Sequence, residues 1–351
     1  MEKSKMLLVA LGQGAGNVVD GLLSKDKRYK GLFLNSSLFD IKPLKNASID
    51  KNVYLYPGMD GSGRDRNKSE EMIKDNANAI GALLRKYPQT ETMVVFTTMG
   101  GGTGSGAIKT FIQIAKSSIP NTKINIIAIL PSLHEDELSF KNTIECWNDI
   151  NSMMDIISDI KFVDNNKRNT YKEINNELVE SLDLAYNIIG IHKDGNIDNK
   201  DSFRINTAEG TGIVLKLYDG LKDEKTAIDL AIKNSVFVQP EIYDCDYLGI
   251  NLKVGGYNPN EVGKYFEVYK STYLTYNDKF NAVVLGGCET PVEAIKLIKI
   301  SLDEKNRRKA QRRRKRSVII DMDEDSNISE INENNKEIEV FSDSLPDILD
   351  V

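Results

Sequence analysis

The sequence predicts an α/β protein built on a parallel β-sheet that helices cover on both faces. Three observations support this fold class. Strand-like apolar segments alternate with amphipathic, helix-like segments through the first half of the chain. The strand-like segments are almost continuously apolar, as in residues 124–130, which is typical of strands buried on both faces. Glycine-rich turns follow several of these segments, and ligands in such sheets bind at the carboxyl ends of the strands.

The elements of the first half follow in a regular order. Strands are expected at 5–11, 31–35, 53–56, 93–98 and 123–130. Helices are expected at 17–24, 69–87, 107–117 and 138–157. A longer helix at 171–191 carries a wide apolar stripe, so we expect it to be buried between two lobes.

The second half predicts a smaller α/β lobe followed by a charged tail. In the lobe, strands are expected at 248–254 and 281–285, and helices at 226–235, 259–273 and 291–305. The last helix continues into a basic run, and the chain then becomes rich in Asp, Glu, Asn and Ser, which predicts disorder. The expected domains are 1–170, a central helix at 171–194, a second domain at 195–300, a basic helix at 301–316 and an acidic tail at 317–351.

Composition narrows the class of protein. The chain has 351 residues, of which 40% are hydrophobic and 28% charged, as in ordinary globular proteins. Its longest apolar runs are far shorter than a membrane span, and its first residues lead directly into a strand without a signal peptide, which predicts a cytoplasmic protein. Cys146, Cys245 and Cys288 are widely spaced, which favours buried thiols over disulfides or a zinc site.

The segment Gly100–Gly106 reads Gly-Gly-Gly-Thr-Gly-Ser-Gly between an expected strand and an expected helix. Backbone amides of such a turn, together with the positive end of the helix, favour a phosphate. A flexible Gly/Ser linker is the alternative, but linkers seldom join a strand directly to a helix. An ordinary P-loop is excluded because Ala107 follows Gly106 and Lys109 is out of register. The candidate phosphate-binding residues are Gly100, Gly101, Gly102, Thr103, Gly104, Ser105 and Gly106.

Two further glycine-rich loops follow strands. The first, 12–17, has Asn17 where a dinucleotide-binding fingerprint needs Gly, and the next strand ends in Asn35 rather than in an acid, so NAD binding is disfavoured. Its glycines still allow a diphosphate to approach the backbone. The second, 58–65, combines three glycines with Arg64, although a surface hairpin would also explain it.

The heptapeptide at 100–106 resembles the signature of the tubulin/FtsZ superfamily of polymerising GTPases at all seven positions. This resemblance implies GTP and GDP as ligands, with Mg²⁺ held mainly by the phosphates and not by a protein metal site. It assigns Gln13, Gly14 and Asn17 to phosphate and base, and Gly63 and Arg64 to the γ-phosphate. The other residues expected at the nucleotide are Gly12, Ala15, Asn35, Pro131, Glu135, Asn165 and Asn176.

Parts of this assignment depart from the family pattern. The segment Pro131-Ser-Leu-His-Glu135 is similar to the family's sugar-binding loop, but a later arginine of that loop falls on Ser139. Asn165 and Asn176 match positions at the purine edge, where amides can read guanine, yet surface asparagines without a role are common.

A second motif, Asn196-Ile-Asp198-Asn-Lys-Asp201, follows the central helix. It resembles the family's Asn-x-Asp-Phe-x-Asp loop, whose carboxylates position water at the nucleotide of a neighbouring subunit. The resemblance implies that Asn196, Asp198 and Asp201 are catalytic, that subunits stack head to tail into filaments, and that polymerisation activates the GTPase. The alternative is that Asp198 or Asp201 caps a helix.

The end of the chain carries two opposite charge blocks. Nine of the twelve residues 305–316 are basic, whereas 321–351 holds eleven acids and one lysine. With the extended last helix, this pattern resembles the TubZ group, which segregates plasmid or phage DNA in the bacterial cytoplasm. The resemblance implies a DNA-bound adaptor of TubR type, bound through the C-terminal tail, an indirect association with centromere-like DNA and no membrane. Expected partner contacts are Arg307, Arg308, Arg312, Arg313, Arg314, Lys315 and Arg316.

Alternatives remain open for this end of the chain. The basic run would also suit DNA itself, an acidic membrane or the acidic surface of a neighbouring subunit, or it is simply a solvated helix end. The apolar residues within 341–349 faintly resemble the terminal peptide of FtsZ, which keeps a cell-division role as an alternative. A nucleotide-dependent structural filament with little turnover is the third possibility.

Overall fold

The computed structural model describes residues 1–58 and 60–316. The expectations for the tail at 317–351 therefore lie outside the described residues. Residues 1–305 form one compact unit, and the expected divisions at 170 and 195 fall inside it.

Ten of the strands that the structure describes form a single sheet, in the order β11-β10-β12-β9-β6-β5-β4-β1-β2-β3. Within this sheet only β12 runs antiparallel to its neighbours, so the predicted parallel α/β class is confirmed. The strands are β1 (Met6–Leu11), β2 (Lys30–Asn35), β3 (Val53–Leu55), β4 (Thr92–Thr98), β5 (Lys123–Leu130), β6 (Asp159–Asp164), β9 (Thr211–Leu217), β10 (Asp244–Lys253), β11 (Glu267–Asn277) and β12 (Asn281–Cys288).

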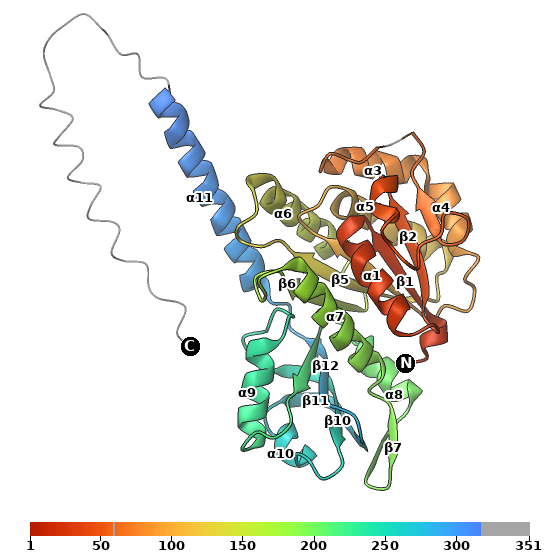
Figure 1. Ribbon diagram of the computed structural model, residues 1–351, viewed down its shortest axis with the longest axis vertical. Helices are drawn as coiled ribbons and strands as arrows, with labels where there is room; N and C mark the ends of the chain where they lie inside the picture. Colours follow the sequence, from red (N-terminus) through yellow and green to blue (C-terminus); the bar gives the residue numbers. More distant parts are fainter. Residues whose placement is uncertain (59, 317–351) are drawn as a thin grey trace, which may run out of the picture. The chain divides into compact units, whose positions relative to one another are not determined.

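Helices cover both faces of this sheet (Figure 1). One face packs against α1 (Gln13–Lys25), α7 (Tyr171–Tyr186) and α8 (Asn199–Asn206). The other packs against α3 (Arg66–Asp75), α4 (Ala77–Leu84), α5 (Thr103–Ser118), α6 (Glu137–Asn151) and the first part of α11 (Val292–Arg316). In β5, Ile127 and Ile129 belong to the apolar core under α1 and α7. Ile124 and Ile126 belong to the core on the opposite face, under α5 and α6. Burial on both faces explains why this strand is continuously apolar.

Smaller elements complete the chain. A 3₁₀ turn (Lys3–Lys5) precedes β1, α2 (Leu38–Ile41) follows β2, and β7 (Gly190–His192) pairs with β8 (Gly195–Ile197) in a hairpin between α7 and α8. Helices α9 (Glu224–Asn234) and α10 (Pro259–Gly263) lie in the C-terminal half, where they pack on a third apolar core.

The two halves of the sheet meet at a narrow seam between β6 and β9. Only Ile160 and Thr211 are in register there. Beside them Lys161 Nζ lies 2.6 Å from Asp159 Oδ2, and both side chains are buried. A Cβ on Gly212 would come within 2.3 Å of both charged groups, so glycine makes room for the pair. Burial raises the pKa of Asp159, and the ammonium group of Lys161 opposes that shift.

Several predicted elements are wrong in their ends or their type. The single helix at 69–87 is two helices, because the Asn76 amide donates to the Met72 carbonyl at 2.8 Å and interrupts the helical bonding. The helix at 259–273 ends at Gly263, because the alternating β-branched and aromatic residues of β11 pair with β10 instead. The central helix ends at Tyr186 rather than Ile191, and strands β6 and β9 were not predicted.

The central helix α7 begins with a capping box, which yields a stability prediction. Thr170 Oγ1 accepts a hydrogen bond from the Glu173 amide at 3.2 Å, and Glu173 Oε2 accepts one from the Thr170 amide at 3.1 Å. Replacing Thr170 by Ala removes the first bond and is expected to lower the free energy of unfolding by about 1 kcal/mol. Thermal or urea unfolding measures this, and Thr170→Ser, which keeps the hydroxyl, is expected to retain most of the stability. Equal losses in the two variants would contradict the capping role.

Candidate functional site

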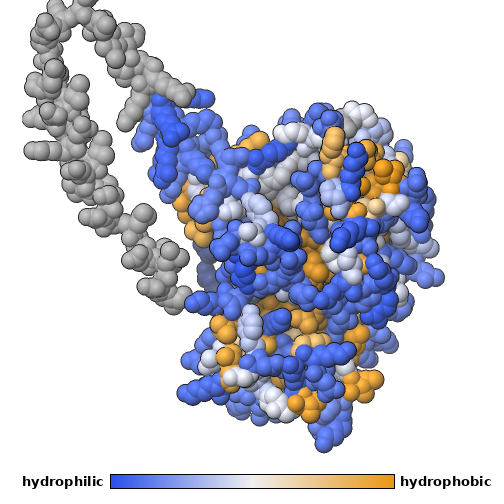
Figure 2. Space-filling model, viewed as in Figure 1, coloured by the Kyte–Doolittle hydropathy of each residue, from blue (hydrophilic) through white to orange (hydrophobic). Residues whose placement is uncertain are grey.

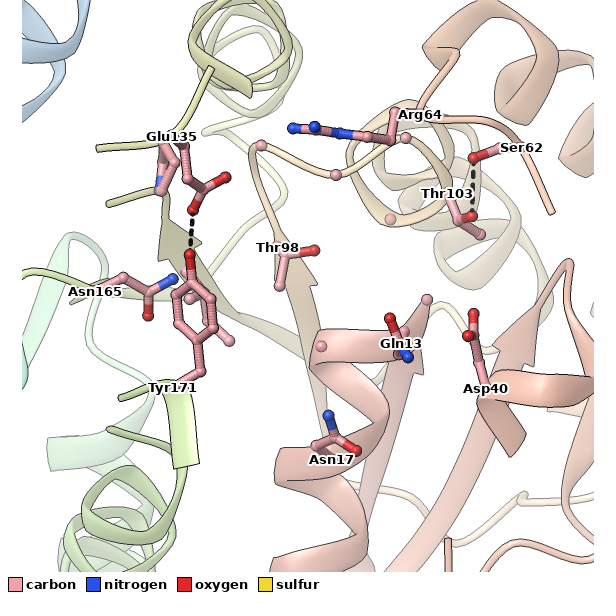
Figure 3. Close-up of a pocket in the computed structure, with 18 of the residues that line it drawn as sticks. Gln13, Asn17, Asp40, Ser62, Arg64, Thr98, Thr103, Glu135, Asn165 and Tyr171 are labelled. Atoms are coloured by element: carbon pink, nitrogen blue, oxygen red, sulfur yellow. Dashed lines mark hydrogen bonds between the residues drawn. The ribbon is translucent and has the colours of Figure 1, made fainter. Parts of the chain in front are cut away.

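A cavity of about 900 Å³ lies where strands β1 to β6 end (Figure 3). Its walls come from the loops after each of these parallel strands, so segments far apart in the sequence converge on one space. This position, at the carboxyl ends of a parallel sheet, is the expected place for a ligand.

The predicted phosphate loop forms one wall of this cavity. Helix α5 begins at Thr103, within the glycine run rather than at Ala107, so its first amides and its positive end face the cavity. Close backbone contacts require glycine in this loop. A Cβ added to Gly102 would lie 2.4 Å from Arg64 Cα, and a Cβ added to Gly104 would lie 2.4 Å from the Leu11 carbonyl oxygen. The loop is thus packed against neighbouring backbone, and its residues 100–104 line the cavity.

The first glycine loop brings a second helix end to the same place. Gly12 has a φ of 84° and precedes α1, whose side chains Gln13 and Asn17 reach the cavity (Figure 3). A Cβ on Gly14 would lie 2.5 Å from Thr98 Cγ2, so this loop too is held close to β4. Two helix N-termini therefore face one cavity, which favours a polyanionic ligand.

The loop at 58–65 closes another side through hydroxyl groups. Thr103 Oγ1 lies 3.2 Å from Ser62 Oγ and 3.1 Å from Ser36 Oγ. The Gly61 amide donates to the Ser36 carbonyl at 2.9 Å, which ties the loop to the end of β2. Gly63 and Arg64, the candidates of this loop for the γ-phosphate, lie in the cavity wall.

The loop after β5 is organised around Glu135. This carboxylate accepts hydrogen bonds from the Ser132 amide at 3.0 Å, the Ser139 hydroxyl at 2.7 Å and the Tyr171 hydroxyl at 3.0 Å. The pKa of Tyr171 is raised, mainly by burial and to a smaller extent by the nearby Glu135 carboxylate. Ser139, where the family pattern has an arginine, accepts a hydrogen bond from the guanidinium of Arg64.

The remaining wall has amide side chains and an aromatic ring. Asn165 follows β6, and Tyr171 is the first residue of α7 (Figure 3). Asn175, on the next turn of α7, also lines the cavity. The structure places Asn175 in the lining, whereas Asn176 is exposed and outside it. Tyr171 was not predicted, although an aromatic residue at the first position of the central helix was visible in the sequence.

Most residues predicted for the nucleotide do meet here. The lining contains Gly12, Gln13, Gly14, Asn17, Gly63, Arg64, Gly100, Gly101, Gly102, Thr103, Gly104, Pro131, Glu135 and Asn165. Four others are buried behind it instead, because they pack their loops together: Ala15, Asn35, Ser105 and Gly106. Lining residues that the sequence argument missed are Ser36, Ser37, Asp40, Gly61, Ser62, Thr98, Ile129, Leu130, His134, Asp136, Tyr171 and Asn175.

The acidic motif lies at the other end of α7, away from the cavity. Helix α7 has 16 residues, which corresponds to roughly 24 Å between Tyr171 and the segment that leads to Asp198. Asp198 Oδ1 accepts from the Asp201 amide at 2.9 Å, and Asp201 Oδ2 accepts from the Asp198 amide at 3.1 Å. The helix-capping alternative is thus confirmed. The pKa of Asp198 is lowered, mainly by the hydrogen bond from the Asp201 backbone amide. The exposed Asp198 side chain is therefore a carboxylate at neutral pH.

Metal, membrane and thiol features are simple in the described part of the chain. No group of three or more His, Cys, Asp or Glu side chains is placed there to hold a metal ion. Among residues 1–58 and 60–316, none of the helices has the length and apolar character to cross a membrane. The three cysteines are buried and unbonded, as predicted.

This fold and cavity define a class of nucleotide-binding protein. Residues 6–170 match the model of the GTPase domain of the tubulin/FtsZ family, and a domain of this kind implies that these residues bind GTP and GDP. More particularly, the chain is similar to the tubulin-like protein TubZ of Clostridium botulinum C phage, with 29% identity over 96% of this chain and 95% of that protein.

Solved structures agree with this assignment. The structure of tail-truncated TubZ from Clostridium botulinum phage c-st has a TM-score of 0.80 and 28% identity, covering 88% of this chain and 100% of the other. A GTPγS-form protofilament of TubZ from Bacillus thuringiensis serovar israelensis has the same fold, with a TM-score of 0.74 at 16% identity over 89% of this chain and 94% of the other.

Proposed function

We propose that this protein is a TubZ-like GTPase that assembles head to tail into filaments and hydrolyses GTP where subunits meet. One observation carries the proposal. The cavity and the acidic motif are at opposite ends of α7, so no single subunit brings Asp198 or Asp201 to its own nucleotide. A second copy stacked on the cavity would bring them there, and such a heterologous contact repeats without closing.

Within the cavity, each group of residues has a chemical role. The amides of residues 100 and 102–104 and the N-termini of α1 and α5 would bind the phosphates, because they supply donors and positive dipole ends without a bulky side chain. The Gly101 amide instead donates to the Thr98 carbonyl at 3.3 Å. Mg²⁺ would neutralise charge between the β- and γ-phosphates and take its ligands mainly from them, since the carboxylates of the lining, Asp40, Glu135 and Asp136, are not grouped to hold a metal ion. Burial raises the pKa of Asp40.

The base would lie between α7 and the end of β6. The ring of Tyr171 is half exposed at this wall, where it suits stacking on a purine. Asn165 and Asn175 offer paired amide donors and acceptors to a guanine edge. Asn175 replaces Asn176 in this role, because only Asn175 faces the cavity.

For hydrolysis, Asp198 and Asp201 would orient and polarise the attacking water at the neighbour's γ-phosphate, with Asn196 holding the same water. Asp198 stays ionised because backbone amides stabilise its charge. At Asp198, capping leaves one oxygen for a stacked subunit, since Oδ1 accepts the hydrogen bonds from both the Lys200 and the Asp201 amides. Asp201 Oδ2 accepts from the Asp198 amide, and its Oδ1 lies 3.4 Å from Arg204 Nη1.

Concentration dependence tests this proposal. Purified protein with GTP and Mg²⁺ is expected to pellet above a threshold concentration, and phosphate release per subunit is expected to rise at the same threshold. GDP is expected not to support pelleting. Pelleting without phosphate release would favour a structural filament and reject the enzyme, whereas release that is independent of concentration would reject the shared active site.

We propose further that these filaments segregate DNA through a DNA-bound adaptor of TubR type. The supporting feature is the basic end of α11, which is helical through Arg316 and carries more cations than a helix end requires. Replacing Arg312, Arg313 and Arg314 by Glu is expected to abolish capture of the adaptor–DNA complex while filaments still form. Retained capture by that variant, together with membrane-anchor binding by the last ten residues, would favour the FtsZ-like division alternative.

An exposed apolar side chain near the acidic motif gives a test of the stacking geometry. Ile191, in β7, is 90% exposed and belongs to the hairpin that precedes Asp198. Burial against a second subunit would explain this exposure, so Ile191→Asp is expected to raise the pelleting threshold about tenfold, because it places a charge in an apolar contact. Sedimentation across protein concentrations measures the threshold. Leu297→Asp, at a 55% exposed position on α11, is the matched control, and equal thresholds in the two variants would contradict this contact.

A further inference from the structure

Arg64 has an unusual backbone at the edge of the phosphate wall. Its φ of 65° makes it the single non-glycine residue in the left-handed region among residues 1–58 and 60–316. Side chains other than glycine adopt this region at a cost, and such residues cluster at functional sites. The backbone is held there from two sides: Arg64 Cα packs against Gly102, and the Arg64 carbonyl accepts a hydrogen bond from Asn142 Nδ2 at 3.1 Å.

The same amide of Asn142 joins two loops. Its Nδ2 also approaches the Gly100 carbonyl at 3.3 Å and the Gly101 carbonyl at 3.2 Å. Asn142 is buried on α6, so the loop of Arg64 and the phosphate loop share one fixed anchor. The pivot of the Arg64 side chain therefore lies directly against the predicted phosphate site.

The guanidinium of Arg64 is held by the opposite loop. Its Nη1 lies 2.6 Å from Asp136 Oδ2, and its Nη2 donates to Ser139 Oγ. Arg64 and Asp136 are 42% and 58% exposed at their side chains, and exposed ion pairs are weak. A multiply charged phosphate, which accepts bidentate hydrogen bonds from arginine, is a stronger partner than this carboxylate.

Ser139 continues the connection toward the base wall. Its hydroxyl donates to Glu135 Oε2 at 2.7 Å, and Glu135 Oε1 accepts from the Tyr171 hydroxyl at 3.0 Å. A hydrogen-bonded chain thus runs from Arg64 through Ser139 and Glu135 to the first residue of α7. Withdrawal of the guanidinium would leave Ser139 its hydrogen bond to Glu135 and leave Asp136 its hydrogen bond from the Ser139 amide.

We propose that Arg64 is a two-position switch, held by Asp136 and Ser139 when no γ-phosphate is present and transferred to the γ-phosphate when GTP binds. This inference rests on the proposed function, and it assigns Asp136 and Ser139 as positioning residues that set the preference for GTP over GDP. The Asp136 carboxylate and the γ-phosphate compete for the same guanidinium. Removing the charge of Asp136 is therefore expected to raise the affinity for the triphosphate.

Affinities of the full chain for GDP and for a slowly hydrolysed GTP analogue test the switch, measured below the pelleting threshold. Asp136→Asn removes the charge but keeps a side chain that caps α6 well, since Asp136 accepts from the Ser139 amide at 2.9 Å. It is expected to increase analogue affinity about fivefold and GDP affinity less than twofold. Arg64→Gly, which suits the left-handed backbone, is expected to reduce analogue affinity about tenfold and GDP affinity less than threefold.

Asp65→Asn is the matched control. Asp65 is the neighbouring residue and also a helix cap, accepting from the Asn67 amide at 2.9 Å, but the guanidinium of Arg64 pairs with Asp136 and Ser139 and not with Asp65. It is expected to change the two affinities equally. The switch is overturned if Asp136→Asn behaves like Asp65→Asn, or if Arg64→Gly weakens both nucleotides alike. If the unaltered protein binds neither nucleotide, the proposed function fails together with the switch. If the unaltered protein binds both nucleotides and the variants give the contrary results above, only the switch fails.

Discussion

Replacement of Asp201 by Asn is expected to reduce GTP turnover by about a hundredfold or more while filaments still assemble. A carboxylate that polarises water contributes on the order of 10²–10⁴ to a rate, and the neutral amide cannot replace it. The amide oxygen of Asn can still accept the hydrogen bond that the Asp198 amide now gives to Asp201 Oδ2 at 3.1 Å, so the helix start is preserved. Phosphate release above the pelleting threshold measures turnover, and sedimentation measures assembly.

The control for this variant is Asp223→Asn. Asp223 also caps a helix, accepting from the Thr226 amide at 2.8 Å at the start of α9, but it lies outside the acidic motif. It is expected to leave turnover within about twofold of the unaltered protein. Comparable losses in both variants would show that Asp201 acts through stability or net charge. Retained turnover in Asp201→Asn would remove this residue from the catalytic assignment.

Replacement of Gly104 by Ala is expected to weaken guanine-nucleotide binding by about a hundredfold or more. The added Cβ would lie 2.4 Å from the Leu11 carbonyl oxygen and 2.7 Å from Thr97 Oγ1. Both belong to buried strands of the sheet, so the first turn of α5 has to move instead. Its amides then leave the phosphates, and each lost hydrogen bond to a charged group costs about 1.5–3 kcal/mol. Titration calorimetry with GDP measures the loss without interference from hydrolysis.

Gly16→Ala is the matched control for this glycine. Its Cβ would lie 3.3 Å from Leu44 Cδ1, the flexible end of a side chain, and α1 keeps its helical backbone there. GDP affinity is expected to stay within about threefold, and the melting temperature of both variants reports whether the fold is intact. A Gly104→Ala protein that binds GDP normally would contradict the role of this loop as a phosphate cradle.

The sequence was most informative where one local pattern has a single physical explanation. Continuous apolar strands require helices on both faces, and this predicted the sheet from β1 to β5 closely. Prediction failed where two patterns compete. Residues 267–273 suit either a helix or a strand on local grounds, and pairing with β10 decides for the strand. At the site, Tyr171 and Asn175 were missed although the start of α7 was predicted correctly, because the face of the helix that meets the cavity depends on how α7 packs against the sheet.

By itself the sequence determined the α/β class, the glycine-rich phosphate loop and the separate acidic motif, because each depends on the spacing of neighbouring residues. Only the tertiary structure decided that six strand ends surround one cavity, that Arg64 is held by Asp136 and Ser139, and that the acidic motif lies at the far end of α7. The physical reason is that these arrangements arise from strand order and helix packing between residues distant in the chain, which local spacing does not encode.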